Sequence, residues 1–220
     1  MSLLEHINDF DRWAVMALNQ HYTPFMDRLM WEVSTLYLWI PLYLTVALLL
    51  YLSYRRRAFR IFVIFVAIIM CVNILGDEIL KPLIGRPRPA YVSDMASKLH
   101  LVTKPNGHRY FGAHDSHPSG HAATTFAFIM LSLYYLWTTL RRRHFFLVFG
   151  IAYVLLVSFS RIYLCVHYPT DILGGYLLGG LIVTSWILFL RKWDAPLLDA
   201  YRMEDIDKTY NHSPLVITDC

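Results

Sequence analysis

The sequence predicts an all-α membrane protein, a polytopic bundle of about six transmembrane helices with an exterior loop subdomain. Hydrophobic residues make up 56% of its 220 residues and charged residues only 16%, whereas a soluble domain carries about a quarter charged residues. The apolar residues also fall into runs long enough to cross a bilayer, separated by stretches rich in arginine or in proline and glycine. This composition excludes secreted, disordered and disulfide-scaffold classes of protein.

Five segments have the length and hydropathy of spanning helices. They run over about Leu36 to Tyr54, Phe59 to Leu80, His121 to Leu140, Phe145 to Ser160 and Asp171 to Leu190. A first segment, Leu4 to Gln20, is amphipathic, with Phe10 and Trp13 on one face and acidic residues on the other. It fits either a sixth, weakly hydrophobic span or a helix in the membrane interface, and its depth stays open.

Arginine clusters predict the orientation of the chain. Arg55–Arg57, Arg141–Arg143 and the pair Arg191 and Lys192 fall on one side if the five spans alternate, and basic loops stay in the cytoplasm. The loop of about residues 81–120 and the link of residues 161–170 then face the exterior. We expect residues 1–193 to form a single membrane-embedded domain and residues 194–220 a cytoplasmic tail. The N-terminus lacks the basic start of a signal peptide, so we expect no cleavage.

Basic residues begin the exterior loop, where the topology rule would not place them. Lys81, Arg86 and Arg88 directly follow a predicted span. Positive charges at the mouth of a helix bundle are costly unless they meet anions. The planar guanidinium group suits bidentate contact with phosphate oxygens, and lysine adds a point charge. Contact with lipid headgroups or interfacial snorkelling is the alternative.

A second stretch, Pro118-Ser119-Gly120-His121, opens a predicted span. Ser119 is a natural N-cap, and the N–H groups of Gly120 and His121 then point out of a helix N-terminus, which readily binds phosphate. His121 is the one side chain here that titrates near neutral pH. An ordinary structural cap is the alternative for Ser119.

A third stretch, from Ser160 to Asp171, places a histidine beside a carboxylate. Asp171 lies four residues after His167, close enough to accept a hydrogen bond from one imidazole nitrogen and leave the other as a nucleophile. Such a pair also occurs around metal ligands, but the neighbouring lysine and arginines predict an anionic substrate rather than a metal. The loop histidines His114 and His117, with His108 and Asp115, match no reliable zinc spacing. We expect His114 and His117, like Arg86, to be headgroup contacts.

Together these stretches resemble the signature of the type 2 phosphatidic acid phosphatase superfamily, K-x6-RP, PSGH and SR-x5-H-x3-D. The signature is complete in Lys81 with Arg88-Pro89, in Pro118 to His121, and in Ser160-Arg161 with His167 and Asp171. It covers about half of the chain. The hydrophobic spans separate this chain from the soluble acid phosphatases and vanadium haloperoxidases of the same superfamily.

The resemblance implies a role for each motif position. His167 would attack phosphorus to form a phosphohistidine, Asp171 would orient it, and His121 would protonate the leaving oxygen. Lys81, Arg88 and Arg161 would hold the phosphoryl oxygens, together with Ser119 and Gly120. No metal or other cofactor is required.

The expected activity is hydrolysis of a lipid phosphate or diphosphate at the exterior face of a bacterial inner membrane. Undecaprenyl diphosphate is the substrate we favour, because its recycling is the most frequent role of bacterial members. Lipid A phosphate, phosphatidylglycerol phosphate and phosphatidic acid are the alternatives. We expect the bilayer and the lipid to be the partners, with no nucleic acid and no obligate protein partner. A lipid transporter with the same cationic mouth is the non-enzymatic rival, and vanadate-dependent oxidation is a second.

Overall fold

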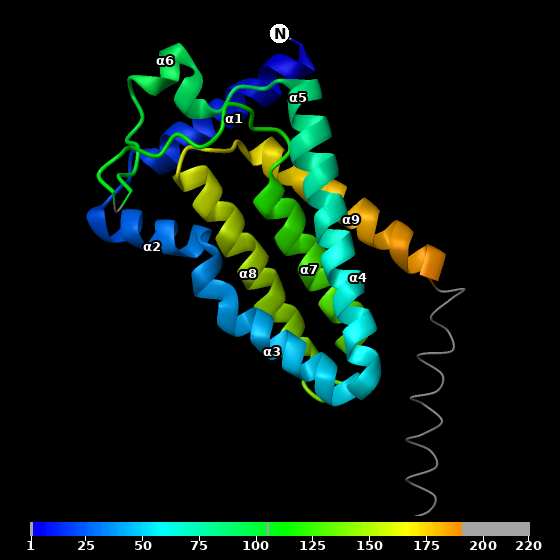
Figure 1. Ribbon diagram of the computed structural model, residues 1–220. Helices are drawn as coiled ribbons and strands as arrows, with labels where there is room; N and C mark the ends of the chain where they lie inside the picture. The colour runs from blue at the N-terminus through cyan, green and yellow to red at the C-terminus, as the bar shows by residue number, and fades with distance from the viewer. Residues whose placement is uncertain (1, 105, 191–220) are drawn as a thin grey trace, which may run out of the picture. The chain divides into compact units, whose positions relative to one another are not determined.

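The computed structural model describes residues 2–104 and 106–190, and the expected cytoplasmic tail of residues 194–220 lies outside the described residues. The described part divides after Val183 into two units. All contacts discussed below lie within the first unit. The described residues form α-helices linked by short 3-10 and π segments (Figure 1). In chain order these are α1 (Leu3–Asn19), α2 (Pro24–Ser34), α3 (Leu36–Tyr54), η1 (Arg55–Arg57), α4 (Ala58–Asn73), η2 (Ile74–Leu80), α5 (Lys81–Ile84), η3 (Pro89–Tyr91), α6 (Ser93–Ala96), α7 (Gly120–Leu136), α8 (Arg143–Tyr163) and α9 (Pro169–Leu190).

The predicted all-α membrane bundle is confirmed. A helical run over Leu36–Ile84, which contains α3 and α4, is long and apolar enough to cross a membrane, as are Arg143–Tyr163 and Pro169–Phe189. The first run turns back at η1, where Arg55 takes a positive φ of 51°, so it supplies two of the predicted spans. The central helix α7 is apolar but shorter, and it ends at Leu136 rather than at Leu140.

Helix α1 exposes apolar side chains and buries polar ones. Ser2 and Glu5 form a capping box at its start. Asp11 and Val15 are completely buried, whereas Phe10 and Trp13 are more than half exposed. The helix is not among those with the length and apolar composition to cross a membrane. This arrangement fits the interfacial alternative for the first segment.

Helix α2 is an element that the hydropathy pattern did not predict. Thr23 caps it through the Met26 N–H, and Pro24 occupies its first turn. Its carboxylate Asp27 accepts hydrogen bonds from Tyr163 Oη at 2.7 Å and from the His100 ring at 2.8 Å. These bonds join α2 to the end of α8 and to the exterior loop.

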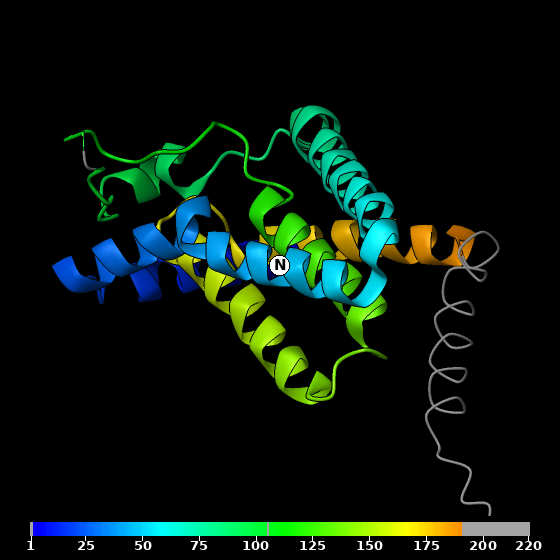
Figure 2. The same cartoon turned by 60° about the horizontal axis from the view of Figure 1, so that its bottom comes forward.

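Helix α7 lies at the centre of the first unit and packs on α8, α4 and α3 (Figures 1 and 2). Its inward residues are small or aliphatic, and Ala123, Ala127 and Leu131 are completely buried. A Cβ on Gly175 or Gly179 of α9 would lie 2.5 or 2.4 Å from a backbone oxygen of Ser119 or Ala123. Glycine at these two positions therefore allows the backbones of α9 and α7 to approach closely.

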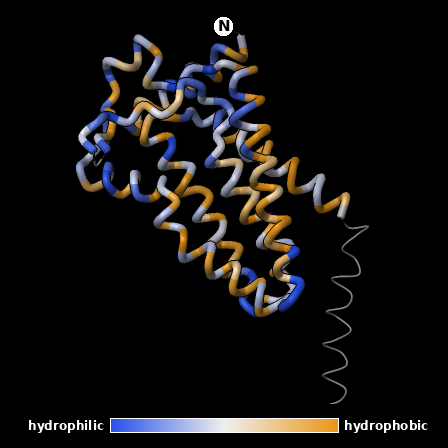
Figure 3. Tube along the Cα trace, viewed as in Figure 1, coloured by the Kyte–Doolittle hydropathy of each residue, from blue (hydrophilic) through white to orange (hydrophobic). Residues whose placement is uncertain are grey.

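Hydrophilic residues gather at the two ends of the long helices (Figure 3). The α3–α4 turn and the α7–α8 turn, which carry Arg55–Arg57 and Arg141–Arg143, both lie at the lower end of the helices in Figure 1. The exterior loop and the start of α7 lie at the other end. There the backbone of residues 86–88 pairs with residues 114–116 through the bonds from Arg88 N to His114 O at 3.0 Å and from Ser116 N to Arg86 O at 2.8 Å. This pairing brings two of the three sequence motifs together.

Candidate active site

His167 and Asp171 meet where α8 passes into α9. His167 lies in the link that precedes Pro169, and both side chains are buried, with exposed fractions of 1% and 0%. His167 Nδ1 lies 3.5 Å from Asp171 Oδ2, which is longer than an ordinary hydrogen bond. The same Oδ2 accepts a 2.8 Å bond from the Tyr168 N–H. Because Nδ1 faces the carboxylate, Nε2 is the nitrogen left for chemistry.

Burial dominates the electrostatics of His167. It lowers the pKa of the imidazole to about 3, and the charges of Arg161 and Arg88 lower it as well, while Asp171 acts in the opposite direction. At neutral pH the imidazole is therefore uncharged and carries a free lone pair. A neutral histidine facing cations is the state that a nucleophile for an anionic substrate requires.

Three cationic side chains line the same cavity as His167. Arg161 is 2% exposed, and its NH2 group donates to Tyr110 Oη at 3.1 Å, while NH1 donates to Ser34 Oγ. Arg88 is 5% exposed and donates from Nε to the Asp115 carbonyl at 3.1 Å. Lys81 pairs with Asp77 at 2.7 Å. All three line a cavity of about 640 Å³.

The positive charge of this cavity favours the binding of an anion. Burial, reinforced by the charge of Arg161, lowers the pKa of the Arg88 guanidinium from its ordinary value. Arg161 Nε is buried and has no hydrogen-bond partner among the described residues. Two buried guanidinium groups that repel each other are stabilised when an oxyanion binds between them.

The N-terminus of α7 borders the site as well, in addition to the His167–Asp171 pair and the three cationic side chains. Ser119 is its N-cap, as predicted, with Oγ accepting from the Ala122 N–H at 3.4 Å. Gly120 and His121 line the cavity, but Ser119 is completely buried and does not. The Ser119 N–H donates to the Asp171 carbonyl at 2.9 Å. That bond ties the start of α7 to the start of α9.

All three residues expected to contact the lipid headgroup lie against aspartate side chains in the structure. None of Arg86, His114 and His117 is among the residues that line the cavity. His114 is exposed and contacts Asp115 at 2.8 Å. The His117 ring contacts Asp171 Oδ1 at 3.1 Å and covers Gly174. Arg86 binds both Asp11 and Asp171. In residues 2–104 and 106–190 no group of three or more His, Cys, Asp or Glu side chains is arranged to hold a metal ion.

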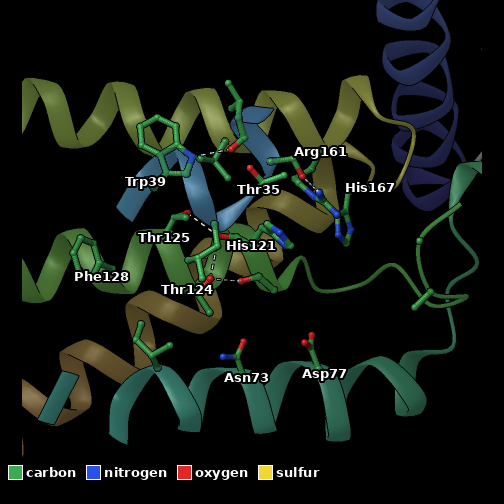
Figure 4. Close-up of a pocket in the computed structure, with 18 of the residues that line it drawn as sticks. Thr35, Trp39, Asn73, Asp77, His121, Thr124, Thr125, Phe128, Arg161 and His167 are labelled. Atoms are coloured by element: carbon green, nitrogen blue, oxygen red, sulfur yellow. Dashed lines mark hydrogen bonds between the residues drawn. The ribbon is translucent and has the colours of Figure 1, made fainter. Parts of the chain in front are cut away.

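The sequence analysis did not predict the wall of the cavity that faces His121. Asn73 and Asp77 project from α4 and η2 into the cavity, across from His121 (Figure 4). Their spacing of four residues, with Lys81 four residues further on, is the signal that could have placed them on one helical face. Ser34, at the end of α2, carried no such signal because nothing near it in the sequence belongs to a motif.

The far part of the cavity is apolar. Val33, Trp39, Phe128 and Val157 line it. A second, almost wholly apolar cavity of about 540 Å³ shares Tyr43, Ile69 and Phe128 with it and extends between α3 and α4. A space that is cationic at one end and apolar at the other fits an amphipathic anion.

Comparisons with known proteins agree with this geometry. Residues 61–195 match the model of the PAP2 superfamily. A lipid A 4'-phosphatase of Bacteroides thetaiotaomicron is 26% identical over 188 residues, which cover 85% of this chain and 79% of that protein. An undecaprenyl-diphosphatase of Sulfolobus acidocaldarius is 33% identical over 159 residues, 70% of this chain and 62% of that protein. The crystal structure of a PAP2-type phosphatidylglycerolphosphate phosphatase from Bacillus subtilis has a similar fold, with a TM-score of 0.62 and 19% identity, covering 86% of this chain and 88% of that one.

Proposed function

Because the chain belongs to the PAP2 superfamily and has apolar helices long enough to cross a membrane, we propose that it hydrolyses a lipid phosphate through a phosphohistidine on His167. The observation that carries this proposal is the burial of His167 beside Asp171, at the cationic end of a cavity whose other end is apolar. A transporter needs the cations and the apolar groove, but it has no need of a buried, neutral imidazole held against a carboxylate.

The first step transfers the phosphoryl group to the enzyme. The Nε2 lone pair of His167 attacks phosphorus and the bond to the leaving lipid oxygen breaks. His121, protonated once the anionic lipid phosphate is bound, gives its proton to that oxygen. Asp171, whose Oδ2 faces His167 Nδ1 at 3.5 Å, stabilises the positive charge on the phosphorylated imidazole. Lys81, Arg88 and Arg161 neutralise the charge on the phosphoryl oxygens.

The second step releases phosphate. A water attacks phosphorus from the side that the lipid has left, and His121, now neutral, accepts the proton of that water. The phosphorus–nitrogen bond breaks, its electron pair returns to Nε2, and inorganic phosphate leaves. Both histidines then hold the protons with which they began, so the cycle closes.

We propose lipid A as the substrate class, ahead of undecaprenyl diphosphate. Asn73 and Asp77 offer hydrogen-bond acceptors beside the phosphate site, on the wall that faces His121. A phosphate carried on a sugar brings hydroxyl groups that can donate to them, whereas a polyprenyl diphosphate brings further negative charge towards Asp77. The lipid A 4'-phosphatase among the relatives supports the same choice.

Undecaprenyl diphosphate is the second candidate. Three cationic side chains in one cavity provide enough positive charge for two phosphate groups, and the undecaprenyl-diphosphatase is the more identical of the two relatives. The apolar groove between α3 and α4 would accept an isoprenoid chain as readily as an acyl chain.

We also propose that the site faces the periplasm. The arginine clusters lie at the end of the helices opposite the site, and basic loops stay in the cytoplasm. The test uses a membrane-impermeant maleimide on intact cells, with a cysteine at Lys98 or at Arg142 in a chain without other cysteines. Labelling of Lys98→Cys alone supports this orientation, and labelling of Arg142→Cys alone reverses it.

The activity test is phosphate release by the purified protein in EDTA. The panel contains lipid A, undecaprenyl diphosphate, phosphatidylglycerol phosphate and phosphatidic acid, with His167→Ala and a matched change of an exposed loop histidine, His108→Ala. We expect release that His108→Ala retains and His167→Ala loses. Binding of the lipids without release from any of them would reject the enzyme and favour the transporter.

The substrate test compares Asn73→Ala and Asp77→Asn on lipid A and on undecaprenyl diphosphate. Asp77 also holds Lys81, so Asp77→Asn affects both lipids, whereas Asn73→Ala leaves the Asp77–Lys81 pair in place. We expect Asn73→Ala to lower kcat/KM on lipid A about 10-fold, the cost of one lost hydrogen bond, with undecaprenyl diphosphate unaffected. Equal losses of kcat/KM on both lipids would reject the proposal that Asn73 binds the sugar of lipid A.

A further inference from the structure

Asp11 of α1 is a completely buried carboxylate outside the part of the chain that matches the family model. It lies on the inner side of a helix that exposes Phe10 and Trp13 outward. A buried charge is costly unless it is paired and hydrogen-bonded, so its partners define its role.

The partners of Asp11 lie at the start of α9 and in the loop that follows α5. The Thr170 N–H donates to Oδ1 at 3.1 Å, and the Thr170 hydroxyl donates to Oδ2. Arg86 NH2 donates to Oδ2 at 2.7 Å. Thr170 is the neighbour of Asp171 in the sequence. Asp11 therefore reaches the element that holds the catalytic carboxylate.

Arg86 joins Asp11 to Asp171. Its NH2 group holds Asp11, while NH1 donates to Asp171 Oδ1 at 2.9 Å and to Thr170 Oγ1 at 2.7 Å. The guanidinium carbon of Arg86 lies 4.1 Å from the centre of the Tyr168 ring, so this ring also packs against the guanidinium group. The two carboxylates outweigh the effect of burial and raise the pKa of Arg86. This fork geometry is specific to arginine.

Both oxygens of Asp171 are thereby fixed. Oδ1 accepts from Arg86 and from the His117 ring, at 2.9 and 3.1 Å. Oδ2 accepts from the Tyr168 N–H and faces His167 Nδ1 at 3.5 Å. The carboxylate cannot rotate towards His167 Nδ1, which has no hydrogen-bond partner among the described residues, without breaking one of these bonds. Its angle to His167 is set by residues that lie outside the cavity.

We propose that Asp11 and Arg86 are positioning residues for phosphoryl transfer. Asp11 holds the guanidinium of Arg86, and Arg86 holds the Asp171 carboxylate at the angle that His167 needs when its imidazole becomes positively charged. The role rests on the proposed phosphohistidine mechanism. Neither residue touches the substrate, so both act on the rate of the chemical step and not on binding of the lipid.

The test measures kcat and KM of Asp11→Asn and Arg86→Gln on the most rapidly hydrolysed lipid of the panel. Partners that orient a metal-bound histidine typically contribute about 10- to 100-fold to activity, and we take the same range for partners that orient the carboxylate beside His167. We expect kcat to fall about 10-fold in Asp11→Asn and about 100-fold in Arg86→Gln, with KM within about 2-fold of wild type. Asp9→Asn, the same change at an exposed position of α1, is the matched control and keeps the wild-type kcat.

The double variant separates positioning from simple anchoring of α1. If Asp11 acts through Arg86, then Asp11→Asn with Arg86→Gln has the kcat of Arg86→Gln alone. Multiplied losses, or folded variants with lower Tm and unchanged kcat, would overturn the proposal. Should Asp11→Asn not fold, Arg86→Lys keeps a cation in the cluster but loses the fork, and a wild-type kcat in that variant would overturn the proposal equally. A wild-type protein that hydrolyses no lipid rejects the proposed function instead.

Discussion

Replacing Gly175 with alanine tests whether the close approach of α7 and α9 builds the active site. A Cβ at this position would lie 2.5 Å from the Ser119 carbonyl oxygen and 3.1 Å from the Ala123 nitrogen, and both are backbone atoms that cannot turn aside. Ordinary contact begins at 3.4 Å, so the two helices must separate by about 0.9 Å. The 2.9 Å bond from Ser119 N to Asp171 O spans this contact and would break.

The separation moves His121 on α7 away from His167 and Asp171. A displacement of about 1 Å between reacting groups costs about 100-fold in rate, so we expect kcat/KM of Gly175→Ala to fall about 100-fold. Alanine is the better helix former by about 1 kcal/mol, which offsets part of the cost of overpacking and keeps α9 helical. The loss would then reflect geometry rather than unfolding.

The assay is steady-state phosphate release, with circular dichroism to verify that the variant is folded. Gly180→Ala is the matched control, because its Cβ would meet only side-chain atoms, of which the nearest is the edge of the Phe126 ring at 3.2 Å, and a ring edge can shift. We expect Gly180→Ala to stay within about 2-fold of wild type, because no backbone atom lies against the added methyl group. A folded Gly175→Ala variant with more than half of the wild-type kcat/KM would refute the reasoning.

Three further predictions concern the cavity itself. Arg161→Lys keeps the charge but loses the planar fork that holds Tyr110, so kcat/KM falls about 100-fold, and a loss under 3-fold would contradict the assigned role. Tyr110→Phe removes the hydroxyl that accepts a hydrogen bond from Arg161, and we expect KM to rise about 5-fold, the cost of one lost hydrogen bond. An unchanged KM would contradict this expectation. With a pKa of about 3, the His167 imidazole stays neutral at pH 5. The ¹⁵N chemical shifts of labelled histidine measure this protonation, and a titration midpoint near pH 6.5 for His167 would contradict the prediction. Because the unfolded state takes up this proton more readily, the free energy of unfolding falls as the pH drops below about 6.5.

The helices that cross the bilayer were predictable because their composition alone determines them. The predicted limits of α3, Leu36 and Tyr54, agree with the structure, since an arginine cluster ends the apolar run. Helix α2 was not predictable by the same rule, because it has 11 residues and carries Asp27, Arg28 and Glu32. Its place depends on bonds to α8 and the exterior loop, which no local pattern records.

The residues of the site also divide into those that the sequence predicts and those that it does not. Lys81, Arg88, His121, Arg161 and His167 line one cavity, and their roles in phosphate binding and catalysis stay predictions. Two features could not be predicted from the sequence. Ser119, whose N-cap role was predicted, does not line the cavity, and Asp11 contacts Arg86 and Thr170, which are 75 and 159 positions away in the chain. Such contacts arise from tertiary packing, so a motif could not reveal them.

The central claim is that phosphate passes through His167, and the most direct measurement is to trap it there. Wild-type protein is mixed with a lipid substrate, quenched in alkali within milliseconds, digested and analysed by mass spectrometry, with His167→Ala as the control. The account predicts phosphate on the peptide that contains His167 in wild-type protein and none in His167→Ala. Phosphate release by wild-type protein with no modified His167 peptide, or with the label on His121, would contradict it.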